Sequence, residues 1–301
     1  MNSNWKNLIS NINVWKRGDQ RAPHKPLLTL LLLARAQQGL SAFVSFEEID
    51  KKLKIALVEF GPQRKSYHPE NPFWHLKTNG FWEVRDADKL ELRTGGHSPS
   101  RRTLLSHNAI GEVPEELWAE LDEDSALVPK LAQLLLNEFW PKTFHDDIAE
   151  FFGLEMVVGQ GSVLTTSRKR DPNFRKEVLR AYDRCCAICG YNGCLGTTPF
   201  GLEAAHIKWH ALGGQDIVPN GLALCSLHHK AFDRGAIGCN EKFELIVSKD
   251  LVGGDTVTRS LIDISGKPLR KPQDKDEMPD VSFIRWHLAN VFQNPERTVR
   301  F

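Results

Sequence analysis

The sequence lacks the features that would set it apart from ordinary folded proteins. Its longest mainly apolar stretch, residues 26–34, is far shorter than the roughly 20 residues that a membrane-spanning helix requires. The first 16 residues have neither the apolar core nor the small-residue cleavage site of a secretory signal. We therefore expect a cytoplasmic protein without a membrane partner. Internal repeats and low-complexity segments are also lacking, which argues against repeat arrays and disordered chains.

Cysteine is scarce, with 6 residues in a chain of 301, too few to suggest a disulfide framework in a protein of this size. A mean hydropathy of −0.36 and a charged fraction of 26% are typical of folded proteins. The length is that of two domains of ordinary size. We expect an α+β protein, with a first domain over residues 1–155, a Gly- and Ser-rich linker over 156–170 and a second domain over 171–301.

The near-neutral net charge of +1 conceals an uneven distribution along the chain. Residues 112–150 contain 11 acidic residues and only two lysines, so the rest of the chain is basic. Residues 92–111 contain three arginines and no acidic residue, and six Lys or Arg residues lie within 168–180. Segregated basic segments are typical of proteins that bind a polyanion, although a single segment is more often only a solvated surface.

The first domain is expected to be mainly helical with one small hairpin. Ser45 and Glu48 form a capping box at the start of a helix that Gly61 ends. Asn79-Gly80, between aromatic-rich segments, predicts a hairpin turn, and Phe73, Trp74 and Trp82 are assigned to the core. Hydrophobic spacing and helix start and stop signals predict helices over residues 5–15, 26–37, 45–60, 127–140, 144–152 and 171–184.

Two pairs of potential metal ligands, each separated by two residues, lie in the second domain. Cys186 and Cys189 form the first pair, and Cys225 and His228 form the second. Three thiolates and one imidazole are typical of a structural zinc site. Cys185, Cys194 and Cys239 remain possible competitors, and Cys185 in particular leaves the ligand register open.

Between and after these pairs lie Glu203-Ala-Ala-His206, Asn220-Gly-Leu and the run from His229 to Gly235. A strand ending at His206, a loop carrying Asn220 and a helix from about Ser226 are predicted. This arrangement resembles the HNH, or ββα-metal, nuclease family, and the resemblance covers about residues 175–240. It implies that His206 is the general base, that His229 ligates a catalytic Mg2+ or Mn2+ ion, and that Asn220 either fixes the loop or ligates the metal.

The chemistry supports this resemblance. Hydrolysis of a phosphodiester needs a water that loses its proton near neutral pH, for which imidazole has a suitable pKa. Many HNH sites carry a further metal ligand directly before the base, where this chain has Ala205. Glu203, Asp216 and Asp233 are possible substitutes, but for each a structural role is favoured; Asp233 is expected to cap or to pair near Arg234. His210 matches no motif position and is expected at the surface.

The first domain resembles the sulfur-binding domain of phosphorothioate-dependent HNH restriction endonucleases. The resemblance depends on Arg21-Ala-Pro-His-Lys-Pro26, on the segment from Tyr67 to Trp74, on the basic run after Arg93 and on the domain order. The resemblance implies that Arg21, His68, Pro69 and Pro72 recognise the sulfur and its phosphate, and that Arg93, Arg101 and Arg102 contact the DNA groove. Sulfur is larger and accepts hydrogen bonds poorly, so it also calls for an apolar wall with cations nearby. The expected wall is Tyr67, His68, Pro69 and Pro72, and the expected phosphate ligands are Arg21, His24 and Lys25. Without the resemblance, the segment from Tyr67 to Trp74 would instead be interpreted as a proline-fixed turn with aromatic residues in the core.

The expected partner is therefore double-stranded DNA that carries phosphorothioate linkages, and a homodimer is possible. Other interpretations remain open at this point. The first domain could instead read methylated or otherwise modified bases, or the chain could be a homing-type nuclease. It could also be a zinc-stabilised DNA-binding protein with an inactive nuclease site, although the retention of His206, Asn220 and His229 argues against this.

Overall fold

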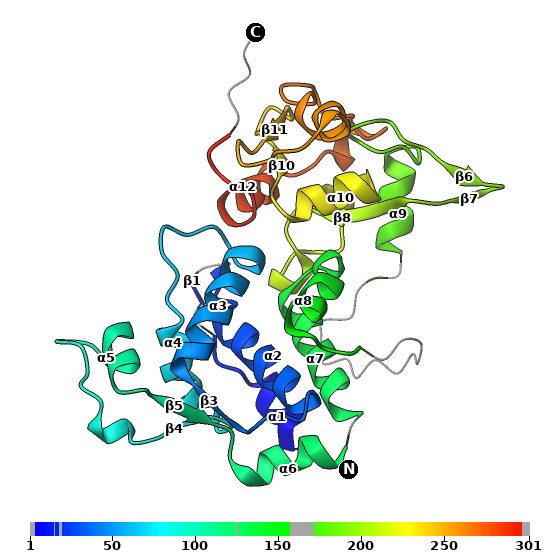
Figure 1. Cartoon of the computed structure of the whole chain (residues 1–301). Helices are drawn as coiled ribbons and strands as arrows, with labels where there is room; N and C mark the ends of the chain where they lie inside the picture. Colours follow the sequence, from blue (N-terminus) through cyan, green and yellow to red (C-terminus); the bar gives the residue numbers. More distant parts are fainter. Residues whose placement is uncertain are drawn as a thin grey trace. The chain divides into compact units, whose positions relative to one another are not determined.

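The computed structural model divides into two compact units, residues 1–167 and 168–301 (Figure 1). It describes residues 4–14, 16–17, 20–124, 126–156, 171 and 173–296, without the side chains of residues 16–17 and 20–21. Most of the expected linker therefore lies outside the described residues. Among the described residues, no helix combines the length and the apolar character needed to cross a membrane. The expected α+β fold class is confirmed.

Unit 1 is built around helix α2 (His24–Gln37), which is buried along most of its length. The leucines of α2 give it apolar side chains on all sides, so this helix occupies the centre of a helical bundle. Helices α3 (Phe46–Phe60), α4 (Glu70–His75), α6 (Glu115–Glu123), α7 (Leu127–Phe139) and α8 (His145–Phe152) pack against it. The remaining helical elements of this unit are α1 (Asn4–Ser10), η1 (Leu76–Asn79), η2 (Ala87–Lys89), α5 (Arg101–Ser106) and η3 (Lys142–Phe144).

A small antiparallel sheet closes one side of unit 1, with the strand order β3-β5-β4. Its strands are β3 (Phe43–Ser45), β4 (Glu83–Val84) and β5 (Ile110–Glu112), and a separate two-stranded pair joins β1 (Lys16–Arg17) to β2 (Gln20–Arg21). The side chain of Trp82 crosses the central strand at Gly111, and its indole nitrogen donates to the carbonyl of Phe73 at 2.7 Å. This contact ties the sheet to α4.

Unit 2 has an antiparallel pair, β8 (Leu202–His206) and β9 (Gly221–Cys225), followed by helix α10 (Ser226–Asp233). Helix α9 (Phe174–Ala181) also packs against both strands. A second antiparallel pair, β10 (Ile237–Cys239) and β11 (Leu245–Val247), packs beside α10 and α12 (Val281–Asn290). The shorter elements are η4 (His210–Leu212), η5 (Val218–Asn220), α11 (Asp255–Val257), η6 (Thr258–Ile262) and η7 (Lys275–Glu277).

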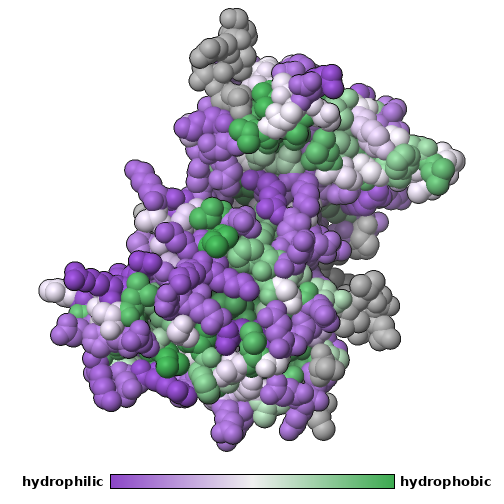
Figure 2. Space-filling view, in the orientation of Figure 1, coloured by the Kyte–Doolittle hydropathy of each residue, from purple (hydrophilic) through white to green (hydrophobic). Residues whose placement is uncertain are grey.

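A two-stranded hairpin, β6 (Cys194–Leu195) and β7 (Thr198–Pro199), extends from unit 2 (Figure 1). Figure 2 shows apolar colour on this hairpin; Leu195 of β6 is 80% exposed, and Phe200, directly after β7, is 56% exposed. Because this hairpin has little burial of its own, it contributes little to the core that positions β8, β9 and α10.

The predicted helices are largely confirmed. The capping box forms as expected, because the Ser45 hydroxyl accepts from the Glu48 amide at 3.2 Å, and α3 ends before Gly61. The helices predicted over 5–15 and 171–184 are shorter, ending at Ser10 and Ala181. The expected core residues Phe73, Trp74 and Trp82 are at most 4% exposed.

The predicted hairpin at Asn79-Gly80 is wrong. Residues 70–79 form α4 and η1, and Gly80 adopts a left-handed conformation with φ of 80° at the end of this helical segment. Asn79-Gly80 does form a turn, but this turn ends a helical segment instead of joining two strands. Pro72 is accommodated in that segment because it lies in the first turn of α4, where a missing amide is tolerated.

The close approach of Trp82 to Gly111 yields a stability prediction. A methyl group at position 111 would overlap the indole ring, which is almost fully buried, so Gly111→Ala should lower the free energy of unfolding by about 1–3 kcal/mol. Thermal or urea unfolding of the full chain measures this. Gly254→Ala, in unit 2, is the control for an added methyl group, because a methyl group there meets no atom within 4 Å. Equal stability of the two variants would contradict the prediction.

Candidate functional site

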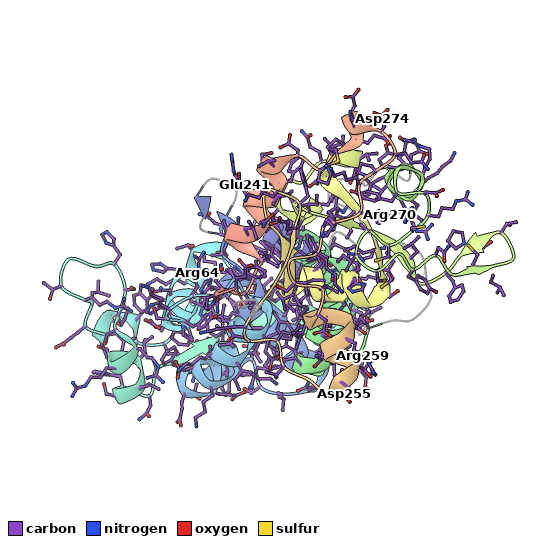
Figure 3. The ribbon with its side chains drawn as sticks, turned by 90° about the horizontal axis from the view of Figure 1, so that it is seen from above. Arg64, Glu241, Asp255, Arg259, Arg270 and Asp274 are labelled. Carbon is purple, nitrogen blue, oxygen red and sulfur yellow. The ribbon has the colours of Figure 1, made fainter. Side chains whose placement is uncertain are left out.

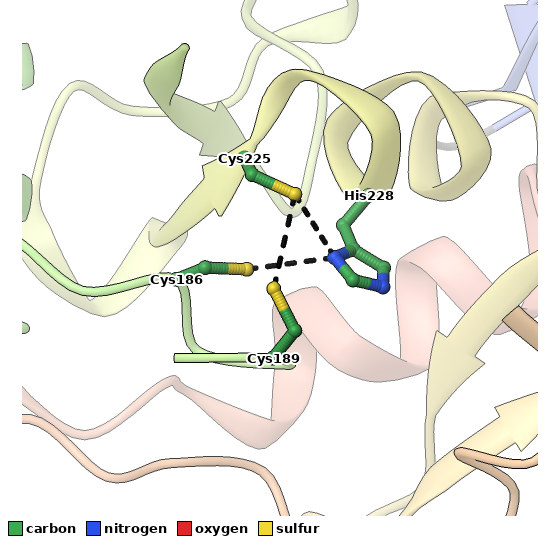
Figure 4. Close-up of side chains that lie close together, drawn as sticks. All are labelled: Cys186, Cys189, Cys225 and His228. Carbon is green, nitrogen blue, oxygen red and sulfur yellow. Dashed lines mark hydrogen bonds between the residues drawn. The ribbon is translucent and has the colours of Figure 1, made fainter. Parts of the chain in front are cut away.

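The strongest cluster of potential metal ligands lies in unit 2 (Figure 4). Cys186 and Cys189 lie on the turn after α9, Cys225 ends β9, and His228 lies in the first turn of α10. Their ligand atoms all lie within 4.8 Å of one another. Nδ1 of His228 is 3.1 Å from Sγ of Cys225 and 3.6 Å from Sγ of Cys186, and the sulfurs of Cys189 and Cys225 are 4.0 Å apart.

These separations fit a tetrahedral ion. Zinc–sulfur bonds of about 2.3 Å place two tetrahedral ligands about 3.8 Å apart. The other ring nitrogen of His228, Nε2, donates to the carbonyl of Ser260 at 3.0 Å, which leaves Nδ1 as the nitrogen with a lone pair for the ion. The structure brings Cys186 rather than Cys185 into the cluster, while Cys194 and Cys239 lie on β6 and β10.

Protonation in the cluster is uneven. The hydrogen bond from Cys225 lowers the pKa of Cys186 to about 3 and the contact with His228 adds to this, although burial opposes the shift. The same contact raises the pKa of Cys225. Zinc binds cysteine as the thiolate, so a cation bound in this cluster would displace the remaining thiol protons.

His206, the predicted base, ends β8 and lies against an acidic residue. Its Nε2 is 2.7 Å from Oδ1 of Asp216, and its ring stacks on Phe174 with centroids 4.1 Å apart. Asp216 also accepts from the amide of Asp171 at 2.7 Å. Burial raises the pKa of Asp216, but the bonds from Asp171 and His206 outweigh this, so that the pKa is lowered and the carboxylate is charged.

The surface position expected for His210 is wrong. This residue is buried, at 9% exposure, and its Nε2 lies 3.6 Å from the second oxygen of Asp216. His206 and His210 therefore share one carboxylate. No motif points to this pair, because Asp216 and His210 come together only when the loop between β8 and β9 folds back.

Asn220 fixes that same loop. Its side-chain oxygen accepts from the amide of Lys208 at 2.8 Å, and its nitrogen donates to the carbonyls of Lys208 and Gln215 at 3.0 and 2.9 Å. The residue is fully buried. Of the two roles expected for it, this geometry favours loop fixation over metal ligation, since the carboxamide is already occupied at both ends.

His229, the predicted ligand of the catalytic metal, lies on α10 between two carboxylates. Its Nδ1 is 2.6 Å from Oε2 of Glu203, and its Nε2 is 3.2 Å from Oδ2 of Asp233. Burial lowers the pKa of His229, but the charges and hydrogen bonds of Asp233 and Glu203 outweigh it and raise the pKa to about 9. Asp233 contacts His229 instead of only capping or pairing near Arg234, as the sequence suggested.

A single scaffold therefore carries all three predicted nuclease residues. His206 pairs with Gly221 across β8 and β9, Asn220 directly precedes that partner, and α10 packs on both strands. Each histidine has its own acidic partners. The arrangement can hold one imidazole as a base and another beside carboxylate oxygens, which is a donor set suited to a divalent cation.

In unit 1, a group of basic residues surrounds one buried acid, Glu70, at the start of α4. Oε1 of Glu70 accepts from Nη2 of Arg93 at 2.9 Å and lies 3.1 Å from Nδ1 of His68. Its side chain is only 5% exposed, whereas those of His68 and Arg93 are 50% and 40% exposed. The buried carboxylate of Glu70 thus holds the partly exposed side chains of His68 and Arg93 in place.

His24 lies within the same group. Burial lowers its pKa to about 4, helped by the charges of Arg64 and His68, so the imidazole is neutral at pH 7. Its Nδ1 is buried without a hydrogen-bond partner among the described residues, as is Oε2 of Glu70. Arg64 lies in the loop between α3 and α4, where Figure 3 labels it.

Further basic residues lie around His75, the last residue of α4. Burial lowers the pKa of His75, and the charges of Lys25, Lys77, His97 and Arg93 lower it further. We call these residues the α4 basic cluster: His24, Lys25, Arg64, His68, His75, Lys77, Arg93 and His97. Four of its members, Arg64, His75, Lys77 and His97, and the acid Glu70 were not predicted from the sequence. Glu70 lies inside the motif from Tyr67 to Trp74, and His97 lies in the acid-free stretch of residues 92–111.

The other predicted DNA-binding residues are placed differently. Arg101 forms a two-fold contact with the buried Asp50 at 2.7 and 2.5 Å, so its guanidinium is engaged within the unit. Lys25 donates to Oδ1 of Asn79 at 2.7 Å. Arg102 is exposed and Tyr67 is half-buried. Pro69 and Pro72 are buried, so these two prolines offer a sulfur atom less surface than expected. The side chain of Arg21 lies outside the described residues.

Comparison with known proteins agrees with this division of the chain. Residues 3–157, just over half of the chain, match a family model described as a ScoMcrA-like DNA sulfur-binding domain. The chain belongs to this family. Residues 186–240 match a model of the HNH endonuclease domain, so the chain is a metal-dependent DNA endonuclease. The sequence-based resemblances to both families are confirmed. No curated protein matches the chain.

Several solved structures are similar to this chain at low identity. The sulfur-binding domain of ScoMcrA in complex with phosphorothioated DNA is 20% identical, with a TM-score of 0.45 over 49% of this chain and 94% of that chain. The sulfur-binding domain of SprMcrA is 15% identical, with a TM-score of 0.42 over 50% and 92%. The type IV phosphorothioation-dependent restriction endonuclease ScoMcrA is 18% identical, with a TM-score of 0.41 over 51% and 35%.

The Cys3His cluster yields a prediction on metal content and stability. Cys186→Ser should lower the bound metal and the unfolding temperature of unit 2, because the energy of metal binding contributes to folding. Metal analysis and thermal unfolding measure both. Cys194→Ser is the matched control, since this cysteine is exposed on β6. Undiminished metal content and stability in Cys186→Ser would show that the cluster holds no structural ion.

Proposed function

We propose that this chain is a restriction endonuclease that recognises phosphorothioated double-stranded DNA and hydrolyses nearby phosphodiester bonds. The observation that carries the proposal is the presence, in one chain, of a sulfur-binding domain and of an HNH domain whose His206, Asn220 and His229 share one scaffold. The first unit selects the DNA, and the second unit cuts it. Such an enzyme acts on DNA in the cytoplasm.

Recognition of the mark follows from the chemistry of sulfur. Sulfur in place of a non-bridging phosphate oxygen is larger and accepts hydrogen bonds poorly, so it loses less on leaving water. The α4 basic cluster supports this role, because it combines the neutral imidazole of His24 with the cations Arg64 and Arg93. The neutral ring suits the sulfur, and the guanidinium groups suit the negative charge of the same phosphate.

Hydrolysis requires a base on one side of the phosphate and a cation near the leaving oxygen. In-line displacement places the attacking water and the leaving oxygen on opposite sides of phosphorus, so the base and the cation act on opposite sides of the reacting phosphate. His206 accepts the proton of the water, and Asp216 orients the imidazole and stabilises its charged form.

Two different ions are assigned to unit 2. Zn2+ suits the Cys3His cluster, where four protein ligands leave no open position, and its role there is structural. Mg2+ or Mn2+ suits the oxygen and imidazole donors near His229, and when bound it would stabilise negative charge that develops on the phosphate. Cleavage of both DNA strands with one nuclease site in each chain calls for two copies, and we propose a homodimer during cleavage.

The proposal is tested with two plasmids of identical sequence, one carrying phosphorothioate linkages and one without them. With Mg2+ or Mn2+, the full chain should cut only the first. His206→Ala should slow cleavage by about 10²- to 10⁴-fold, as removal of a general base does, and should still retain the modified DNA in a gel shift. Equal cleavage of the two plasmids would reject sulfur recognition, and full activity of His206→Ala would reject the base.

The role of the α4 basic cluster is tested by Arg93→Ala. This change removes the guanidinium that Glu70 positions and should weaken binding to phosphorothioated DNA by about tenfold or more, as loss of a charged hydrogen bond does. Arg85→Ala is the control, because Arg85 is a partly exposed arginine of the same unit that pairs with Glu112. Binding by titration of a labelled duplex gives the comparison, and an equal loss in both variants would argue against a specific role for Arg93.

A further inference from the structure

Position 205, where many HNH nucleases carry a metal ligand, holds an alanine without any donor atom. Ala205 is fully buried between β9 and its own neighbours on β8. In a strand, residues two positions apart point to the same face. The nearest side chain that reaches the same side of β8 is therefore that of Glu203, which is longer than an aspartate and extends toward α10.

We propose that Glu203 and His229 together hold the catalytic divalent cation, and that Glu203 replaces the ligand missing at Ala205. The inference deepens the proposed function and rests on it. Glu203 and His229 come from two elements, β8 and α10, and their donor atoms already meet, with Oε2 of Glu203 2.6 Å from Nδ1 of His229. A cation between these two atoms would take the place of the proton that now joins them.

The neighbours of this pair orient it as a metal site requires. Asp233, with a side chain only 1% exposed, lies 3.2 Å from Nε2 of His229 and fixes the imidazole with Nδ1 toward Glu203. A carboxylate behind a histidine that ligates metal through its other nitrogen is a recurrent arrangement in metal sites. The hydroxyl of Ser226, at the start of α10, donates to Oε1 of Glu203 at 2.8 Å and leaves Oε2 directed at His229.

Exposure distinguishes the two carboxylates. The side chain of Glu203 is 43% exposed, so water can complete the shell of an ion bound there, as Mg2+ and Mn2+ prefer. Asp233 is enclosed and serves as the orienting group. The third candidate, Asp216, is engaged by the Asp171 amide and by His206, and so belongs to the base.

The test measures Mn2+ binding to the full chain with its Cys3His cluster loaded, by electron paramagnetic resonance of the free ion. Glu203→Gln keeps the size of the side chain and its contact with Ser226, and should weaken Mn2+ binding by about 10- to 100-fold. Glu203→Asp, which retains a shorter carboxylate, should give an intermediate loss. Asp216→Asn is the matched control and should leave Mn2+ affinity unchanged while lowering the cleavage rate, because it acts on the base.

Metal content of the Cys3His cluster and the unfolding temperature verify that each variant is folded. Unchanged Mn2+ affinity in Glu203→Gln, or an equal loss in Asp216→Asn, would overturn the inference, as would a wild-type chain that binds no Mn2+. Failure of the proposed function gives a different pattern. A wild-type chain that binds Mn2+ through Glu203 but cuts both plasmids equally would reject sulfur recognition and support the metal ligand.

Discussion

The Cys3His cluster is the constraint on which the geometry of unit 2 depends. It joins the turn after α9, the end of β9 and the first turn of α10 at one point. His228, a member of the cluster, directly precedes His229, and successive residues of a helix point about 100° apart. Fixing His228 therefore fixes the rotation of α10 about its axis, and with it the direction in which His229 meets Glu203. In the proposed enzyme, the Cys3His cluster would thus position the nuclease residues without taking part in the reaction.

Unit 1 solves a different electrostatic problem. Cations placed together for a phosphate repel one another, and a free arginine pays for a fixed position in conformational entropy. Glu70 offsets both costs, because its buried carboxylate holds Arg93 and His68 while occupying almost no exposed surface. Burial keeps His24 neutral within the same cluster. The α4 basic cluster thus combines a neutral imidazole with cations that are held in place, the combination on which the proposed recognition of a phosphorothioate rests.

Local signals and short-range spacing were sufficient for much of the fold. The Ser45 cap, the leucine-rich α2 and the β8–β9–α10 order follow from interactions between residues close in the chain or from motif spacing. Contacts between distant segments were not predictable in this way. The pairing of Arg101 with Asp50, 51 residues away, is one example. The contact of His210 with Asp216 is closer in the chain, but it depends on how the loop between β8 and β9 folds back, which residue spacing does not indicate.

The nuclease scaffold is acidic where it must meet a polyanion. Glu203, Asp216 and Asp233 all lie beside His206 or His229. The hydrogen bond with His229 lowers the pKa of Glu203 despite burial. The hydrogen bond from the Asp171 amide likewise lowers the pKa of Asp216, although burial opposes the shift. Without a divalent cation, such a site repels phosphate at close range. A divalent cation held by these side chains would remove that repulsion and let a phosphate approach the histidines, so the acidic site and the proposed metal ion depend on each other.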